Sequence, residues 1–94
     1  MKHYIIAKFR DRNDTQRLLP EITELFNQTM ALEGVEKVEI HPSNSTRENR
    51  YSLMIEMTVT PEGLERYDAC EAHKLWKAKY GDLLEGKAIF DCEE

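Results

Sequence analysis

Four segments of the chain have the alternating pattern of apolar and polar residues that is typical of β-strands. β-Branched and aromatic side chains are concentrated in these segments, which span residues 3–10, 35–41, 51–59 and 87–92. Side chains alternate between the two faces of a strand, and the first segment carries apolar residues on both faces near its start. We therefore expect neither face of this strand to lie in water alone.

A stretch with apolar residues at helical spacing, residues 18–32, follows the first predicted strand. Asp14 or Thr15 can cap the start of this helix, and Gly34 ends it, because glycine adopts the left-handed conformation most easily. Pro20 lies inside the stretch, where it removes a backbone donor. We therefore expect a kink or an irregular first turn there.

A second helical stretch begins at Thr60, which is followed by proline at the first helical position and so favours a helix start. It extends to Tyr80, and we expect a break near Cys70. The order of elements is then β-α-β-β-α-β, which predicts the ferredoxin-like fold, an α+β fold with an antiparallel sheet. The 94 residues contain no linker and no repeat, so they are expected to form a single domain, residues 1–94.

One face of the predicted sheet carries no helix, because the ferredoxin-like fold places both helices on the other face. The residues expected on this bare face are apolar: Tyr4, Ile6, Met54, Ala88 and Phe90. Such a surface is rarely left in water, and two sheets that face each other would cover it. The sequence therefore predicts a homodimer formed through this face.

Charge and composition exclude several classes of partner. The formal net charge is −5, and an acidic chain lacks the basic surface that attracts nucleic acids and anionic membranes. No apolar stretch approaches the roughly 18 residues of a membrane span, and we expect no signal peptide. Cys70 and Cys92 have no partner motif and are expected to be reduced thiols, which favours a cytoplasmic location.

Four short motifs follow one another along the chain. Residues 3–10 read HYIIAKFR, residues 34–35 are Gly-Val after Glu33, residues 67–73 read YDACEAH, and residues 89–91 read IFD. In order and spacing they resemble four motifs of the stress-responsive A/B barrel (Dabb) family, which are H-hydrophobic-hydrophobic-x-x-K-F-K/R, P-G-V, Y-x-x-H-P-x-H and I-x-D. The resemblance covers essentially the whole chain and implies a dimeric α/β barrel of two ferredoxin-like protomers.

The resemblance also implies candidate site residues, through a plant polyketide cyclase of this family that performs an intramolecular aldol condensation. The catalytic histidine of that enzyme corresponds to His73 and its assisting tyrosine to Tyr67. Its first-strand histidine corresponds to His3, and the aspartate of its last strand to Asp91. The chain departs from the family pattern at Leu53, which replaces a pocket histidine, and at Cys70 and Glu71, which replace the first histidine and the proline of the third motif.

The residues themselves allow a catalytic and a structural interpretation. Imidazole titrates near neutral pH, so His73 can act as a general base, and the Tyr67 hydroxyl can donate a hydrogen bond to an oxyanion. A separation of six residues does not share one helical face, so the two converge only if the helix breaks between them. Otherwise His73 caps or packs, and Tyr67 is a core aromatic. His3 is expected to bond Asp91, either at the edge of the core or to orient a pocket group.

Four further residues are candidates for the pocket between sheet and helices: Trp76, Phe26, Ile5 and Leu53. Aromatic residues at helical spacing also fit a plain core. No H-x-x-x-H or C-x-x-C spacing occurs, so neither a metal nor a cofactor is expected. We expect a Dabb-type protein with acid–base chemistry, cyclase-like or lyase-like, on a small hydrophobic carbonyl compound. The alternatives are a non-catalytic, stress-associated or ligand-binding dimer and, third, a haem- or quinone-handling monooxygenase.

Overall fold

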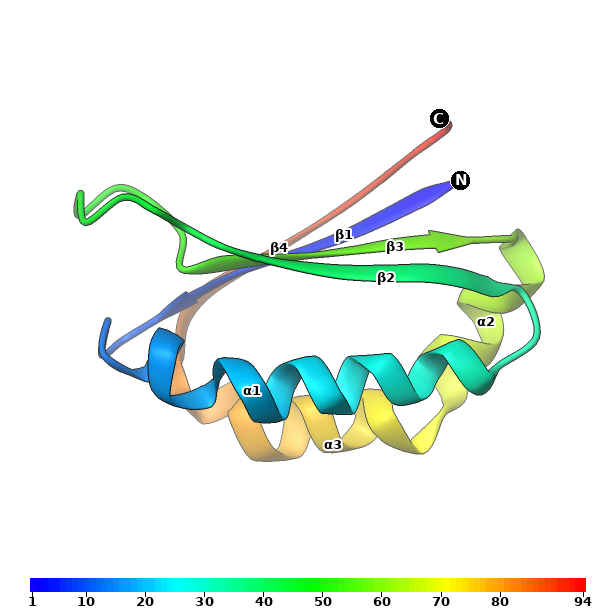
Figure 1. Cartoon of the computed structure of the whole chain (residues 1–94), viewed down its shortest axis with the longest axis horizontal. Coiled ribbons are helices and arrows are strands. Elements are labelled where there is room, and N and C mark those ends of the chain that lie inside the picture. The colour runs from blue at the N-terminus through cyan, green and yellow to red at the C-terminus, as the bar shows by residue number, and fades with distance from the viewer.

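The computed structural model describes all residues from 1 to 94 as a four-stranded antiparallel sheet covered on one face by helices (Figure 1). The strands are β1 (Lys2–Phe9), β2 (Val35–Pro42), β3 (Leu53–Val59) and β4 (Leu84–Cys92), arranged in the order β2-β3-β1-β4. All three neighbouring pairs are antiparallel. This order is that of the ferredoxin-like fold, so the fold predicted from the sequence is confirmed.

The helices α1 (Asp14–Asn27), α2 (Pro61–Ala69) and α3 (Glu71–Tyr80) lie on the same side of the sheet (Figure 1). Two short 3-10 turns, η1 (Gln28–Ala31) and η2 (Gly81–Leu83), follow α1 and α3. The core fills the space between sheet and helices, where the largest buried side chains are Phe9, Phe26, Tyr67, Trp76 and Tyr80. None of the helices is long and apolar enough to cross a membrane.

Helix α1 starts differently from the prediction. Asn13 precedes the helix and makes no side-chain capping bond, while Asp14 and Thr15 are buried within the first turn. A cap at Asp14 or Thr15 is therefore wrong, because the preceding turn already starts the helix: the Asp14 N–H donates to the Asp11 carbonyl, 3.0 Å away. The Thr15 N–H likewise donates to the Arg12 carbonyl, and both bonds lie ahead of Pro20, so they are not the irregularity expected from that residue. The helix itself continues through the exposed Pro20.

Gly34 ends the first helical region as predicted, with a φ of 92°. Its carbonyl oxygen would lie only 2.2 Å from a Cβ placed on Gly63, so α2 approaches this turn more closely than any side chain allows. The predicted start of α2 is also confirmed, because the Thr60 hydroxyl accepts a hydrogen bond from the Gly63 N–H at 3.0 Å. Two glycines thus fix where α2 leaves the sheet.

The helix break predicted near Cys70 is present. Cys70 has an extended backbone between α2 and α3, and its Sγ accepts a hydrogen bond from the His73 N–H at 3.4 Å. The break redirects the chain so that the rings of Tyr67 and His73 come together, with centroids 4.8 Å apart. The one geometric condition for convergence of these two residues is therefore met.

β1 and β2 differ from the predicted ranges by one residue, and two other strands begin two or three residues away from the prediction. β4 begins at Leu84 and not at residue 87, because a shift of register between Lys8 and Phe9 lets Leu84 pair with Phe9. β3 begins at Leu53 and not at residue 51. Ser52 still donates its N–H to the Ala7 carbonyl at 2.7 Å, and its hydroxyl accepts from the Phe9 N–H at 2.9 Å.

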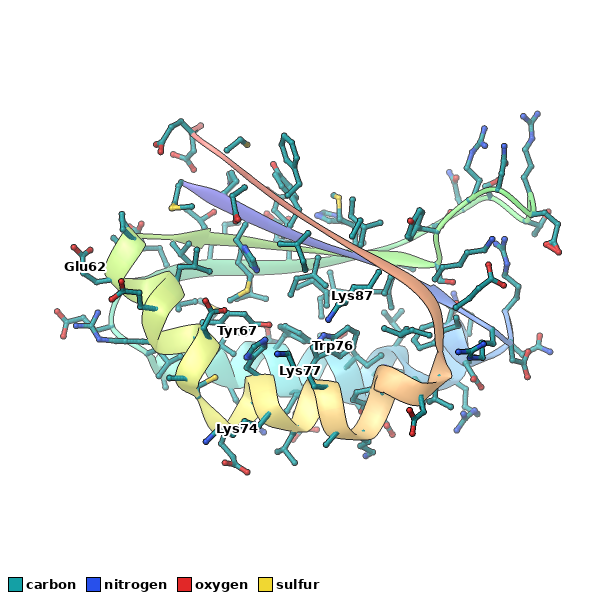
Figure 2. The ribbon with its side chains drawn as sticks, turned by 180° about the vertical axis from the view of Figure 1, so that it is seen from behind. Glu62, Tyr67, Lys74, Trp76, Lys77 and Lys87 are labelled. Carbon is teal, nitrogen blue, oxygen red and sulfur yellow. The ribbon has the colours of Figure 1, made fainter.

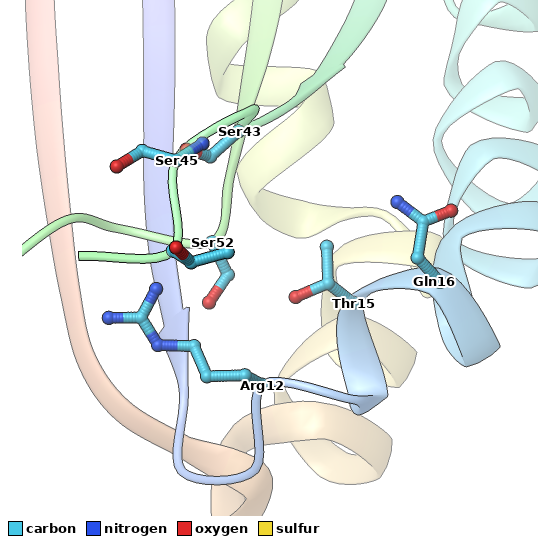
Figure 3. A pocket seen from close by; sticks show the side chains of 7 residues that line it. Arg12, Thr15, Gln16, Ser43, Ser45 and Ser52 are labelled. Carbon is cyan, nitrogen blue, oxygen red and sulfur yellow. The ribbon is translucent and has the colours of Figure 1, made fainter. Parts of the chain in front are cut away.

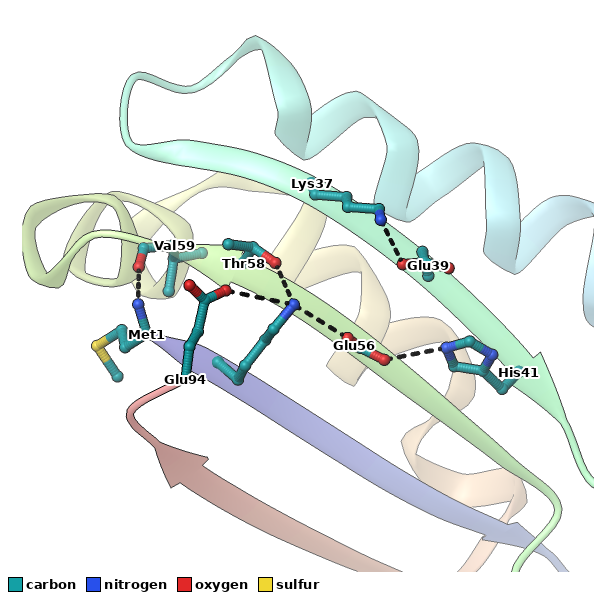
Figure 4. A network of polar contacts seen from close by, with 9 residues as sticks. Met1, Lys37, Glu39, His41, Glu56, Thr58, Val59 and Glu94 are labelled. Carbon is teal, nitrogen blue, oxygen red and sulfur yellow. Dashed lines mark hydrogen bonds and ion pairs between the residues drawn. The ribbon is translucent and has the colours of Figure 1, made fainter.

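The face of the sheet without helices has an apolar half and a charged half. In the apolar half, the rings of Tyr4 and Phe90 lie 6.3 Å apart, and Phe90 is 59% exposed. The half-buried side chains beside them are Ile6, Met54 and Ala88. In the charged half, Lys2 Nζ lies 3.1 Å from Glu56, which also bonds His41 at 3.2 Å (Figure 4). The hydrogen bond from Lys2 lowers the pKa of Glu56 below its ordinary value.

Candidate functional site: a cleft between the sheet and the second helical region

An open cleft of about 500 Å³ lies between strands β1 and β4 on one side and helices α2 and α3 on the other (Figure 2). Its volume is within the range of small-molecule sites in proteins. The two strands contribute His3 and Asp91, and the two helices contribute Tyr67 and His73. The cleft thus contains the four residues that the sequence singled out for acid–base chemistry.

Tyr67 is the most unusual residue of the cleft. Its side chain is 1% exposed, and its hydroxyl is buried without any hydrogen-bond partner. Burial raises the pKa of the phenol above its ordinary value, and the neighbouring Cys70 and Asp68 raise it further. At neutral pH the Tyr67 hydroxyl is therefore protonated, which makes it a hydrogen-bond donor and not a base.

His73 is held by a contact that fixes its tautomer. Its Nδ1 lies 2.9 Å from the carbonyl oxygen of Asp68 at the end of α2. A carbonyl only accepts hydrogen bonds, so Nδ1 carries the proton and Nε2 of the neutral ring has a free lone pair. His73 therefore has the protonation pattern of a general base.

His3 lies on the other side of Tyr67. Its Nδ1 is 2.5 Å from Oδ1 of Asp91, which is its cross-strand neighbour on β4, and the ring is buried. Because an ionised carboxylate accepts, Nδ1 of the neutral ring is again the protonated nitrogen. The His3 and Tyr67 ring centroids are 5.8 Å apart. The phenol is thus flanked by two imidazoles, each oriented by an oxygen.

Two lysines lie on opposite sides of this cleft. Lys77 projects from α3 and Lys87 from β4, around the gap over Trp76 (Figure 2). Four of the seven lysines form ion pairs, namely Lys2, Lys8, Lys37 and Lys79. Neither cleft lysine forms one. Of the two acids in the lining, Asp91 bonds His3, and Asp68 forms no ion pair. Each wall of the cleft thus carries one lysine that forms no ion pair.

The structure separates the other predicted pocket residues. Trp76 and Ile5 line the cleft. Phe26 lies behind it, with its ring 6.2 Å from that of Tyr67 and 5.2 Å from that of Trp76. Leu53 is buried in the sheet beside Ala7 and does not line the cleft. Phe26 therefore supports the walls, and Leu53 lies outside the site.

The sequence analysis missed Lys77 and Lys87, although their spacing places both beside predicted site residues. Lys77 follows His73 by four residues and so shares its helical face, and Lys87 lies two and four residues before Ile89 and Asp91 on one strand face. Both spacings were readable from the sequence alone. No group of three or more His, Cys, Asp or Glu side chains is arranged to hold a metal ion, and Cys70 and Cys92 are free.

No protein-family model matches the sequence, and no curated protein matches it either. The structure is similar to a dimeric ferredoxin-like protein of unknown function from Bacteroides fragilis, with a TM-score of 0.81 and 15% identity over 99% of this chain and 94% of that one. It is also similar to a Dabb family protein from Mesorhizobium loti, with a TM-score of 0.74 and 15% identity over 99% of this chain and 94% of that one. A protein from Arabidopsis thaliana is similar as well, with a TM-score of 0.77 and 20% identity over 99% of this chain and 93% of that one. The chain therefore has the same ferredoxin-like fold as a protein of the Dabb family, and its sequence motifs resemble those of the same family.

Proposed function

We propose that this chain binds a small carbonyl compound in the cleft and performs acid–base chemistry on it. The observation that carries the proposal is the buried Tyr67 hydroxyl, which has no partner within the protein. Leaving such a group unpaired costs about 1–3 kcal/mol, and a ligand oxygen that accepts from it would recover this free energy. The hydroxyl is sealed from solvent, so a ligand reaches it only when a neighbouring side chain of the cleft moves aside.

The protonation states define the reaction. Nε2 of His73 would remove a proton from the carbon next to a carbonyl group, while the Tyr67 hydroxyl donates to the carbonyl oxygen on which negative charge develops. The enolate would then attack a second carbonyl carbon of the same molecule, and the imidazolium would return its proton to the new alkoxide. This sequence is an intramolecular aldol closure, and it needs no oxidant or metal. His3 and Asp91 would position the phenol.

The lysines indicate a ligand that also carries an acidic group. Lys77 and Lys87 are two cations of the cleft lining that form no ion pair, in a chain whose net charge is −5. Lys77 and Lys87 would bind a carboxylate, while the carbonyl group reaches Tyr67 and an apolar part lies on Trp76. We therefore infer an acid that carries two keto groups, or the cyclic or aromatic acid formed from it, as the class of ligand.

A homodimer formed through the bare sheet face is part of the proposal. Tyr4, Ile6, Met54, Ala88 and Phe90 form its centre, since an exposed ring such as that of Phe90 gains stability from burial. Similar proteins from Thermobifida fusca and Jannaschia are described as dimeric. This supports the same assembly here, in which two sheets enclose a barrel.

A screen of keto acids and aromatic acids by thermal shift and mass spectrometry tests this function. We expect a ligand that raises the melting temperature and is consumed, with turnover lost in His73→Gln and kept in His41→Gln, since His41 lies on the bare face of the sheet. A ligand that binds but is not consumed would show a binding protein without catalysis. No stabilising ligand, or equal turnover in both variants, would contradict the proposed role of His73.

A further inference from the structure

A second pocket lies where the turn between β1 and α1 meets the segment between β2 and β3 (Figure 3). Its volume is about 210 Å³. All of its lining residues are polar, and they are Arg12, Thr15, Gln16, Ser43, Ser45, Thr46 and Ser52. None of them lines the cleft described above, and none is a carboxylate.

Arg12 joins the two walls of this pocket. Its Nη2 donates to the carbonyl oxygens of Arg47 and Glu48, at 2.7 and 2.9 Å. Lys8 donates to the Glu48 carbonyl as well, at 2.5 Å. These contacts hold the segment between β2 and β3 over the start of α1. The Nε and Nη1 groups of Arg12 make no hydrogen bond within the protein and remain available as charged donors.

The serine hydroxyls of the pocket are also free to donate. Oγ of Ser43, Ser45 and Ser52 each accepts from a backbone N–H, at 3.1, 3.2 and 2.9 Å. Each hydroxyl keeps its own proton, for which the protein supplies no acceptor. Backbone N–H groups thus donate to the three serine oxygens, while the O–H protons of these serines remain free to bond a ligand.

Thr15 shows that the pocket is more than a polar surface. Its side chain lies on the first turn of α1 and the residue is 8% exposed, yet its hydroxyl makes no hydrogen bond within the protein. The hydroxyl points into the pocket (Figure 3). Asp14, the nearest acid on the helix, is bound by Arg17 at 2.7 Å and does not line the pocket.

The surplus of donors determines what the pocket would bind. Its ligand must supply acceptors and a negative charge opposite Arg12. A carboxylate offers two oxygens, whereas a phosphate group offers three strong acceptor oxygens for a larger set of donors. The volume corresponds to about seven water molecules, which leaves room for a phosphate and a few further atoms. We propose that this pocket binds a phosphate group, either as the free ion or as part of a phosphomonoester.

An NMR titration of the ¹⁵N-labelled protein with inorganic phosphate, in a buffer without phosphate, tests this site. We expect saturable shifts in the amides of residues 12–16 and 43–52. Thr15→Val preserves the shape of the side chain and removes its hydroxyl, so phosphate should bind about tenfold more weakly or worse. Thr23→Val on the same helix is the matched control and should bind as the unchanged protein does.

Separate titrations with glycerol phosphate and glycerol distinguish the source of the ligand. Equal binding of glycerol phosphate and inorganic phosphate would assign the pocket to the free ion, and tighter binding of the ester would assign it to a phosphomonoester. Either result supports the proposal. Shifts absent at millimolar phosphate, equal affinity in Thr15→Val and Thr23→Val, or glycerol binding as well as its phosphate would overturn it.

Discussion

Tyr67→Phe removes one oxygen atom from the centre of the cleft and should make the ligand-free protein more stable. The hydroxyl is buried without a partner, so folding strips it of water and returns no hydrogen bond. That loss costs about 1–3 kcal/mol, while the small void left by one oxygen costs a fraction of a kcal/mol. The net expectation is a gain of about 1 kcal/mol in the free energy of unfolding. Few substitutions at a residue that is 1% exposed are expected to stabilise a protein.

Tyr80→Phe is the matched control for this change. Tyr80 is also buried in the helical layer, but its hydroxyl donates to Glu21 at 2.7 Å. The same chemical change should therefore lower stability at Tyr80 and raise it at Tyr67. Urea unfolding and thermal melts at one protein concentration measure both, and a gain of 1 kcal/mol in a domain of this size corresponds to a melting temperature about 4–8 °C higher.

The outcome at Tyr67 separates a ligand site from a structural tyrosine. If Tyr67→Phe destabilises the protein as much as Tyr80→Phe does, the Tyr67 hydroxyl has a partner in solution, and the reasoning from its isolation is refuted. If Tyr67→Phe stabilises the protein and also weakens ligand binding, the Tyr67 hydroxyl lowers the stability of the fold but is needed for function.

Three other predictions concern the sheet and its contacts. The hydrogen bond from Lys2 lowers the pKa of Glu56, so its contribution to stability is complete at neutral pH and is lost as the pH falls from about 4.5 through the lowered value. Lys2→Met should flatten this acid dependence in urea unfolding. Gly63→Ala should destabilise the protein by about 1–3 kcal/mol, because its Cβ would meet a backbone oxygen, whereas Gly81→Ala meets no atom within 4 Å and should be neutral or slightly stabilising. Phe90→Glu should convert dimers to monomers in light scattering, and a monomeric unchanged protein would refute the proposed assembly.

The fold was predictable because its signals are local. Alternation of apolar residues identified the strands, and Thr60-Pro61 and Gly34 marked helix ends whose geometry depends on few neighbours. One error arose where a distant strand decides, and the other where a local turn was not recognised. The early start of β4 depends on a register shift in β1, and the helix start at Asp14 depends on a bond made by the preceding turn.

Only some residues of the cleft were predictable: His3, Ile5, Tyr67, His73, Trp76 and Asp91 line it, whereas Phe26 and Leu53 do not and the two lysines were missed. The sequence singled out His73 and Tyr67, but their convergence depends on the break at Cys70. The surroundings of Tyr67 depend on packing against rings from three other elements, α1, β1 and α3. The phosphate pocket had no sequence signal, because Arg12 and Ser43 are 31 residues apart and meet only in the folded chain.

The central claim is that the cleft binds an acidic carbonyl compound through the Tyr67 hydroxyl. A ¹H–¹⁵N NMR titration with a panel of small keto acids tests it most directly, in the unchanged protein and in Tyr67→Phe. We expect shifts concentrated at His3, Tyr67, His73 and Asp91, with at least about tenfold weaker binding in the variant. A panel that shifts none of these residues, or that binds both proteins equally, would contradict it.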